Sequence, residues 1–127
     1  MPTKSRGEIE AEISRAMVQF EIDYMGRGPK EARTYIIEDF VLIRLKGVLT
    51  PAEEQLTKSA EGGELVKKMR TTLVEKAKPL LYQVVNEITG TKVLELHTDI
   101  STASGERVFV FSFERDLETQ LPRRKGA

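Results

Sequence analysis

The run from Ala32 to Leu45 constrains the fold most, because it predicts a β-hairpin that is apolar on both faces. Most of its residues are β-branched, aromatic or long aliphatic, and Glu38-Asp39 interrupts them where a tight turn would fall. With that turn, one face carries Tyr35, Ile37, Phe40 and Leu42, and the other carries Ile36, Val41, Ile43 and Leu45. A hairpin with one wet face alternates apolar and polar residues, so we expect this one to be covered on both sides.

Capping signals predict helices before and after this hairpin. Ser5-Arg6-Gly7-Glu8 has the spacing of a capping box, and the apolar stripe that follows ends at Gly26. Thr50-Pro51-Ala52-Glu53 opens a second helix, which we expect to break or kink at Gly62-Gly63. The acidic pair Glu53-Glu54 suits the positive end of that helix dipole.

A longer helix follows the glycine pair. Its predicted apolar stripe comprises Leu65, Met69, Leu73, Ala77, Leu80, Leu81, Val84, Val85 and Ile88. Pro79 lies inside this stripe and predicts a bend toward the core. The basic residues of the helix indicate a solvated face, or else a surface for an acidic partner or lipid headgroups; they are Lys67, Lys68, Arg70, Lys76 and Lys78.

The remaining strands form a second hairpin. Val93 to Ile100 and Val108 to Phe113 flank a polar loop, and Phe109, Phe111 and Phe113 share the face expected to meet the core. The order αββααββ predicts an α+β fold of two layers: a four-stranded antiparallel sheet from two hairpins, with helices on one face. We expect a single domain over residues 1–127, with a folded core at 5–115 and a flexible tail at 117–127.

Composition excludes several classes of function. The chain has no Cys, a single His and 20 basic against 20 acidic residues. It therefore lacks the ligands of Cys-rich or His-rich zinc sites and iron–sulfur clusters, and the basic excess typical of nucleic-acid binding. No window is apolar enough to span a membrane. We predict a cytoplasmic protein that has no nucleic-acid partner, metal or cofactor.

Two segments offer candidate binding residues. His97 and Asp99 would project from the same face of a strand about 6.5 Å apart, but no nucleophile accompanies them, which favours a polar pair over catalysis. The loop that contains Arg27 and Lys30 resembles an anion-binding loop, yet it follows a helix C-terminus, whose dipole repels anions. Together with Arg33, these residues are candidates for contacting a ligand or partner, and none is assigned a catalytic role.

Four segments together resemble the MpsC-like family of small bacterial proteins. They are Gly7-Glu8-Ile9-Glu10; Gly26-Arg27-Gly28-Pro29 with Ala32-Arg33-Thr34-Tyr35-Ile36; Leu45-Lys46-Gly47-Val48-Leu49-Thr50-Pro51-Ala52-Glu53; and Leu96-His97-Thr98-Asp99-Ile100-Ser101 with Gly105-Glu106-Arg107-Val108. The resemblance covers about residues 5–115. It implies a stand-alone cytoplasmic protein, associated in some bacteria with membrane subunits that move ions and take up inorganic carbon. It supplies no catalytic residues.

The leading hypothesis is a non-enzymatic accessory or regulatory protein. We expect it to self-associate, most simply as a dimer, because the doubly apolar hairpin needs cover, and to dock on a membrane-protein partner. The alternative is a sensor that binds a small anion or nucleotide through Arg27, Lys30 and His97. Acid/base catalysis by His97 and Asp99 is the weakest of the three hypotheses.

Overall fold

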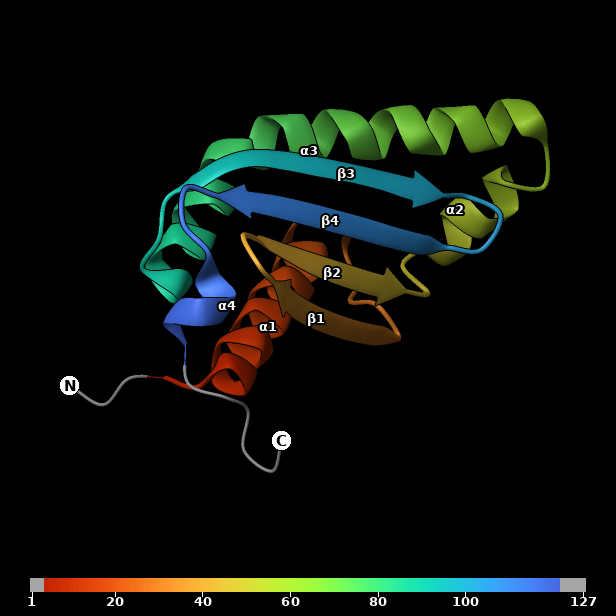
Figure 1. Cartoon of the computed structure of the whole chain (residues 1–127). Coiled ribbons are helices and arrows are strands. Elements are labelled where there is room, and N and C mark those ends of the chain that lie inside the picture. The colour runs from red at the N-terminus through yellow and green to blue at the C-terminus, as the bar shows by residue number, and fades with distance from the viewer. Residues whose placement is uncertain (1–3, 122–127) are drawn as a thin grey trace.

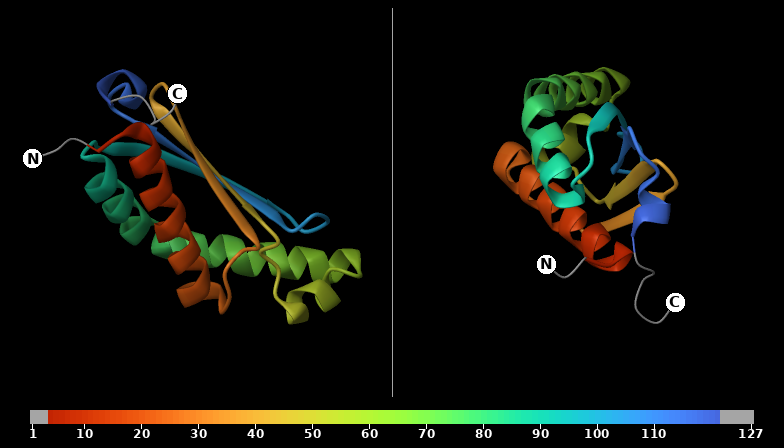
Figure 2. Two further views of the ribbon diagram at one scale, coloured as in Figure 1. Left: turned by 90° about the horizontal axis from the view of Figure 1, so that it is seen from below. Right: turned by 60° about the vertical axis from the view of Figure 1, so that its left-hand side comes forward.

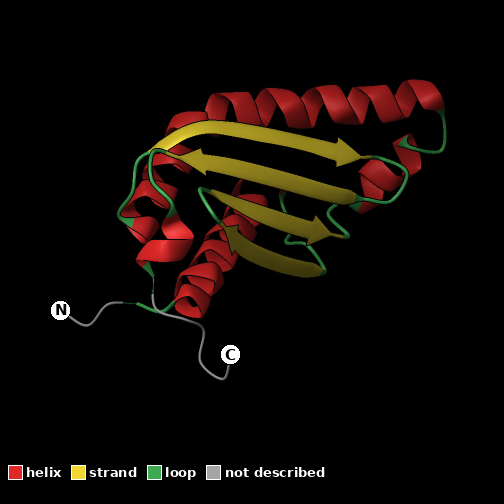
Figure 3. Cartoon of the chain, in the orientation of Figure 1, coloured by secondary structure: helices red, strands yellow, loops and turns green. Residues whose placement is uncertain are grey.

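Two β-hairpins form one antiparallel sheet, and the helices cover only one of its faces (Figures 1 and 3). The computed structural model describes residues 4–121. In chain order the elements are α1 (Arg6–Met25), β1 (Glu31–Ile37), β2 (Phe40–Lys46), α2 (Pro51–Leu56), α3 (Ala60–Thr89), β3 (Val93–Ser101), β4 (Glu106–Phe113) and α4 (Leu117–Gln120). Figure 2 shows the sheet on one side and α1 with α3 on the other. The predicted two-layer α+β fold is confirmed.

The first hairpin has the register that its sequence predicts. Tyr35 pairs with Leu42, and Ile37 pairs with Phe40 across the Glu38-Asp39 turn. Glu38 takes a positive φ of 51°, which is uncommon for a residue other than glycine. The start of α4 supports this turn, because the Glu38 N–H donates to Glu118 Oε1 (3.0 Å) and the Glu118 N–H donates to the Glu38 carbonyl (3.1 Å).

The two hairpins join through their inner strands, which gives the strand order β1-β2-β4-β3. The predicted phenylalanine face of β4 is confirmed as core: Phe109, Phe111 and Phe113 are all buried. The opposite side, which we call the open sheet face, bears apolar side chains that helices do not cover. They are Tyr35, Ile37, Phe40, Leu42, Val108 and Val110, which are exposed or half-buried.

The break between α2 and α3 lies earlier than predicted. The chain leaves the helix at Thr57, and Ser59 caps α3, so Gly62-Gly63 falls within the first turn of α3. Gly62 is needed there for a different reason than breaking a helix. A Cβ atom at this position would lie 1.9 Å from the Leu56 carbonyl oxygen, so only glycine lets α3 start so close to the end of α2.

The long helix α3 is continuous over 30 residues and contains Pro79. Figure 2 shows that α3 changes direction within its C-terminal half, where Pro79 lies, as predicted. Beyond the proline, Leu81 and Val85 are buried against the sheet layer.

The folded region extends past residue 115. Leu117 is 1% exposed and belongs to the core, and Arg6 Nη1 of α1 lies 3.2 Å from Glu118 Oε2. A single apolar residue after the cap Asp116 carries no periodicity, so the sequence pattern does not reveal this contact. Residues 122–127 of the predicted tail lie outside the described residues.

Replacing Pro79 with Ala tests whether the bend serves packing. In a straight exposed helix alanine would stabilise by about 3 kcal/mol relative to proline. We expect a gain in the free energy of unfolding below about 2 kcal/mol, because a straighter helix would redirect Leu81 and Val85 away from their contacts. Urea unfolding measures this gain. A larger gain would contradict a packing role for the bend.

Candidate functional site

A cluster of four charged residues is buried between the helix layer and the sheet. Arg70 of α3 is fully buried, as is Glu21 of α1, and Glu53 of α2 and Arg107 of β4 are 5% and 1% exposed. Arg70 Nε and Nη2 donate to the two oxygens of Glu53, each at 2.7 Å, and Arg70 Nη1 donates to Glu21 Oε1 at 3.1 Å. The guanidinium of Arg70 on α3 is therefore bonded to both α1 and α2.

Glu53 is both a helix cap and an ion-pair partner. Its Oε1 accepts the Thr50 N–H at 2.9 Å, which completes the capping box predicted for α2. Burial opposes ionisation of Glu53, but the hydrogen bonds from Arg70 and Thr50 outweigh burial and hold the pKa of this carboxyl below its usual range. Glu53 is therefore a carboxylate in the folded protein at neutral pH.

Glu21 and Arg107 are less well satisfied. Burial raises the pKa of Glu21 despite the opposing attraction of Arg70, and burial lowers the pKa of Arg107 to about 10. Within the described residues, Glu21 Oε2 and Arg107 Nη1 have no hydrogen-bond partner. Arg107 Nε donates to Thr98 Oγ1 at 3.3 Å, and its guanidinium carbon lies 5.2 Å from the centre of the Phe109 ring. The two arginines and two glutamates of the cluster balance in formal charge, and buried charges need partners of the opposite sign.

This cluster corrects one sequence interpretation and extends another. Arg70 does not belong to a solvated basic face, and Glu53 makes a buried ion pair with Arg70 besides lying at the positive end of the α2 dipole. The buried stripe of α3 runs through Val66, Arg70 and Val74, one residue on from the predicted Leu65, Met69 and Leu73. The sequence indicates this burial in one way: Arg70 lies four residues after Val66 and four before Val74, so the three share one face of the helix.

The structure does not pair His97 with Asp99. Both side chains project from the same face of β3, as predicted, and this face points away from the core, but His97 Nε2 lies 3.2 Å from Glu95 Oε2. Asp99 instead accepts the Ile100 N–H at 2.8 Å and lies 3.2 Å from Lys67 Nζ. These two contacts, the backbone one foremost, lower the pKa of Asp99. Neither residue meets a nucleophile through these contacts, so the geometry offers no acid/base dyad.

The other three candidate residues lie apart from His97. Arg27 Nη1 donates to the Leu49 carbonyl at 3.3 Å, where it helps to join the loop after α1 to the loop before α2. The Lys30 side chain packs over Gly47, and Arg33 Nε lies 3.0 Å from Glu31 Oε1 on the open sheet face. The structure therefore does not gather these cations into one anion site, and a binding role for each stays a prediction.

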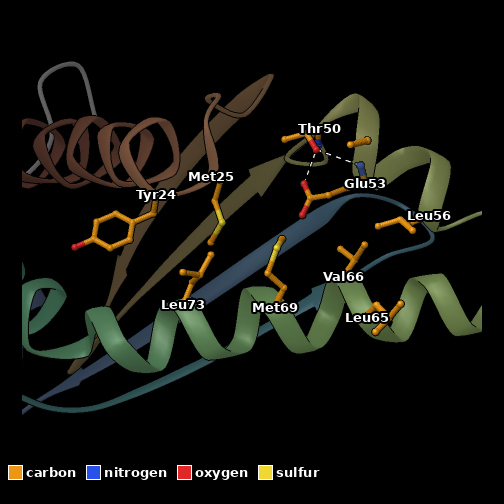
Figure 4. Close-up of a pocket in the computed structure, with 10 residues that line it drawn as sticks. Tyr24, Met25, Thr50, Glu53, Leu56, Leu65, Val66, Met69 and Leu73 are labelled. Carbon is orange, nitrogen blue, oxygen red and sulfur yellow. Dashed lines mark hydrogen bonds between the residues drawn. The ribbon is translucent and has the colours of Figure 1, made fainter.

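An apolar cavity opens beside the buried cluster (Figure 4). Its volume is about 420 Å³, within the range of ligand and peptide sites. It lies between the end of α1, α2 and the first half of α3, and Leu65 (56% exposed) and Met69 (45% exposed) are on its rim. The lining residues are Tyr24, Met25, Thr50, Ala52, Glu53, Leu56, Leu65, Val66, Met69 and Leu73. Because both oxygens of Glu53 already accept hydrogen bonds, the cavity offers mainly apolar contact.

Residues 4–121 contain neither a metal-binding group of side chains nor a membrane-spanning helix. No group of three or more His, Cys, Asp or Glu side chains in this range is placed to hold a metal ion. No helix in the same range is both long enough and apolar enough to cross a membrane.

Residues 5–115 match a family model described as "MpsC: Na+-translocating membrane potential-generating system (MpsC)". The chain is 45% identical over 120 residues to a Bacillus subtilis (strain 168) protein named "Uncharacterized protein YbcI", covering 94% of this chain and 97% of that protein. It is 29% identical over 102 residues to "Uncharacterized protein YrhF" of the same organism, covering 77% and 81% of the two chains. No solved structure matches the chain.

The Arg70→Leu variant tests the buried cluster. It would leave Glu21 and Glu53 buried without their shared cation, and we expect the free energy of unfolding to fall by about 3–5 kcal/mol. Lys68→Leu on the exposed side of the same helix is the matched control, with an expected change within about 0.5 kcal/mol. Urea unfolding compares the two, and equal effects would show that Arg70 does not balance buried charge.

The Glu21→Gln variant tests the pH dependence of stability. A carboxyl with a raised pKa in the folded state contributes stability at low pH that is lost as pH rises through the folded pKa. The variant lacks this loss, so its stability relative to the natural protein should improve as pH rises above about 4.5, the ordinary pKa of a Glu carboxyl. Urea unfolding from acid to neutral pH checks the direction, and a parallel pair of curves would contradict it.

Proposed function

The chain belongs to the MpsC family, and on that premise we propose that it is a non-enzymatic accessory or regulatory protein of a membrane-potential-generating system. In this proposal it is cytoplasmic and acts by binding a membrane-protein subunit of that system. The observation that carries the proposal is the apolar cavity between α1, α2 and α3, which has exposed apolar side chains on its rim.

The distribution of charge supports binding over catalysis. The charged residues that converge, Arg70 and Arg107 with Glu21 and Glu53, are buried and balance in formal charge. Catalysis at neutral pH needs titratable groups that can reach a substrate, usually in a cleft. The cavity between α1, α2 and α3 offers instead the apolar side chains of Leu65 and Met69. Such a surface suits recognition of another apolar surface.

The cavity fits the apolar side of a partner's helix or an extended segment. Leu65, Met69 and Leu73 are spaced by four residues along α3, so they form one continuous ridge against the end of α1. Helix-in-groove recognition uses ridges of this kind, and methionine adapts its shape to the partner. We assign this cavity to the membrane-protein partner.

The alternative function, a small-anion or nucleotide sensor, receives less support. It needs Arg27, Lys30 and His97 to act on one ligand, whereas the Arg27 guanidinium bonds to a backbone carbonyl and His97 lies beside Glu95. A thermal-shift panel of metabolites separates the two functions, since a ligand at 100 times its dissociation constant stabilises by about 2.7 kcal/mol.

The Met69→Glu variant tests the docking function. A charge on the cavity rim would have to be desolvated on binding, so we expect at least a tenfold loss of affinity, roughly 1.4 kcal/mol. The assay is sedimentation with inverted membrane vesicles from cells that express the membrane subunits of the system, against vesicles from cells that lack them. Leu94→Glu is the matched control, because Leu94 is similarly exposed and does not line the cavity.

Two outcomes would contradict the docking function. One is wild-type protein that sediments equally with both kinds of vesicle. The other is a Met69→Glu variant that binds as tightly as the wild type while remaining folded.

A further inference from the structure

We propose that the open sheet face binds the same face of a second copy, around a two-fold axis parallel to the strands, so that β1 of one protomer lies over β3 of its partner. This inference deepens the proposed binding function by naming the occupant of a second surface. It concerns the side of the sheet opposite the cavity between α1, α2 and α3.

The centre of the open sheet face is apolar across three strands. Tyr35 on β1 pairs with Leu42 on β2, and Leu42 pairs with Val110 on β4, so these three side chains form a continuous row. Ile37 and Phe40 extend the apolar surface in the next row. A contiguous apolar patch on a sheet face indicates an interface, because leaving it in water is costly.

Charge on this face is divided between the two hairpins. The first hairpin contributes three cations and one carboxylate: Arg33, Arg44, Lys46 and Glu31. The second contributes three carboxylates and one histidine: Glu95, Asp99, Glu106 and His97. One half of the face is therefore positive and the other half negative.

This division selects one of the two in-plane symmetry axes. An axis perpendicular to the strands would place each strand over its own copy, so the positive first hairpin would face the positive first hairpin of the partner. An axis parallel to the strands, between β2 and β4, places β1 over the partner's β3 and β2 over the partner's β4. Only the second arrangement sets positive against negative, and complementary charge is what fixes orientation at an interface.

The parallel axis also sets the register. It keeps each residue at the same height along the strands, to within about one residue for the roughly 30° angle between packed sheets. Arg33 and Asp99 lie in the same cross-strand row, so Arg33 meets the partner's Asp99. Leu42 likewise meets the partner's Val110. Each contact occurs twice in the dimer.

The ion pairs that these residues make within one chain do not prevent this exchange. Arg33 pairs with Glu31, and Asp99 pairs with Lys67, but all four side chains are more than 40% exposed. Exposed pairs of this kind contribute little stability.

The sheet edges are less suited to pairing than the face. On the outer strand β1, the Ile36 N–H donates to Glu10 Oε2 of α1 at 2.8 Å, so a buried carboxylate already occupies one donor of this edge. The other outer strand, β3, has a register irregularity between Val93 and Glu95. Covered and irregular edges oppose strand addition, which leaves the face as the route to association.

The first experiment measures the mass of the purified full chain by light scattering and sedimentation equilibrium at micromolar concentration. The wild type should be a dimer, and Leu42→Asp should be a folded monomer. Leu65→Asp is the matched control on the helix layer and should remain dimeric. A monomeric wild type would overturn the proposal, as would a Leu42→Asp variant that is still a dimer.

The second experiment tests the axis by charge reversal. Arg33→Glu and Asp99→Arg should each raise the dimer dissociation constant about tenfold, because each turns two attractions into two repulsions. The double variant, or an equimolar mixture of the single variants, should return to within about threefold of the wild type, since opposite charges then meet again. Arg15→Glu, an exposed reversal on α1, is the control and should have no effect.

Single reversals that do not weaken the dimer would overturn the parallel axis, because the perpendicular axis sets the positive hairpin over its own copy and predicts no loss of affinity for Arg33→Glu. Failure of the dimer proposal can be distinguished from failure of the docking function. A monomeric wild type that binds the membrane vesicles through Met69 would refute the dimer and leave the docking function standing.

Discussion

The bonding of one guanidinium, that of Arg70, underlies the arrangement of the helices. Its planar fork meets the Glu53 carboxylate at two points, and its remaining donors reach Glu21 and the Val48 carbonyl. A buried charge with this many partners has a single low-energy position, because each lost bond would leave a charge without compensation. The six-residue α2 depends on it most, since so short a helix is unstable by itself.

The position of Arg70 has a consequence for the protein surface. Turning Arg70 inward places Val66 and Val74 in the core and turns Leu65 and Met69 out to the rim of the cavity. The interaction that stabilises the helix layer therefore also creates its apolar binding surface. In the proposed dimer the two sheets face each other, so both cavities point outward, and two sites on one particle would raise the avidity for a membrane that carries several copies of the partner.

Much of the fold could be predicted because its determinants are local. The register of the first hairpin follows from a two-residue turn, and both capping boxes use residues only three positions apart. The candidate site was less predictable. His97 and Asp99 were correctly placed on one face of a strand, but their partners were not predicted. His97 contacts Glu95 of the same strand, and Asp99 contacts Lys67 of α3, 32 residues earlier in the chain.

By itself, the sequence determined the hairpins, the caps, the bend at Pro79 and the two-layer α+β class, since periodicity and turn chemistry act over a few residues. Only the tertiary structure decided that β2 pairs with β4, that α3 buries Arg70 in place of Met69, and that Leu117 joins the core. These choices depend on partners distant in the chain, such as Glu21, 49 residues from Arg70. A buried arginine and a solvated one occupy the same kind of position in a helical pattern, and what separates them is whether two carboxylates arrive to meet it.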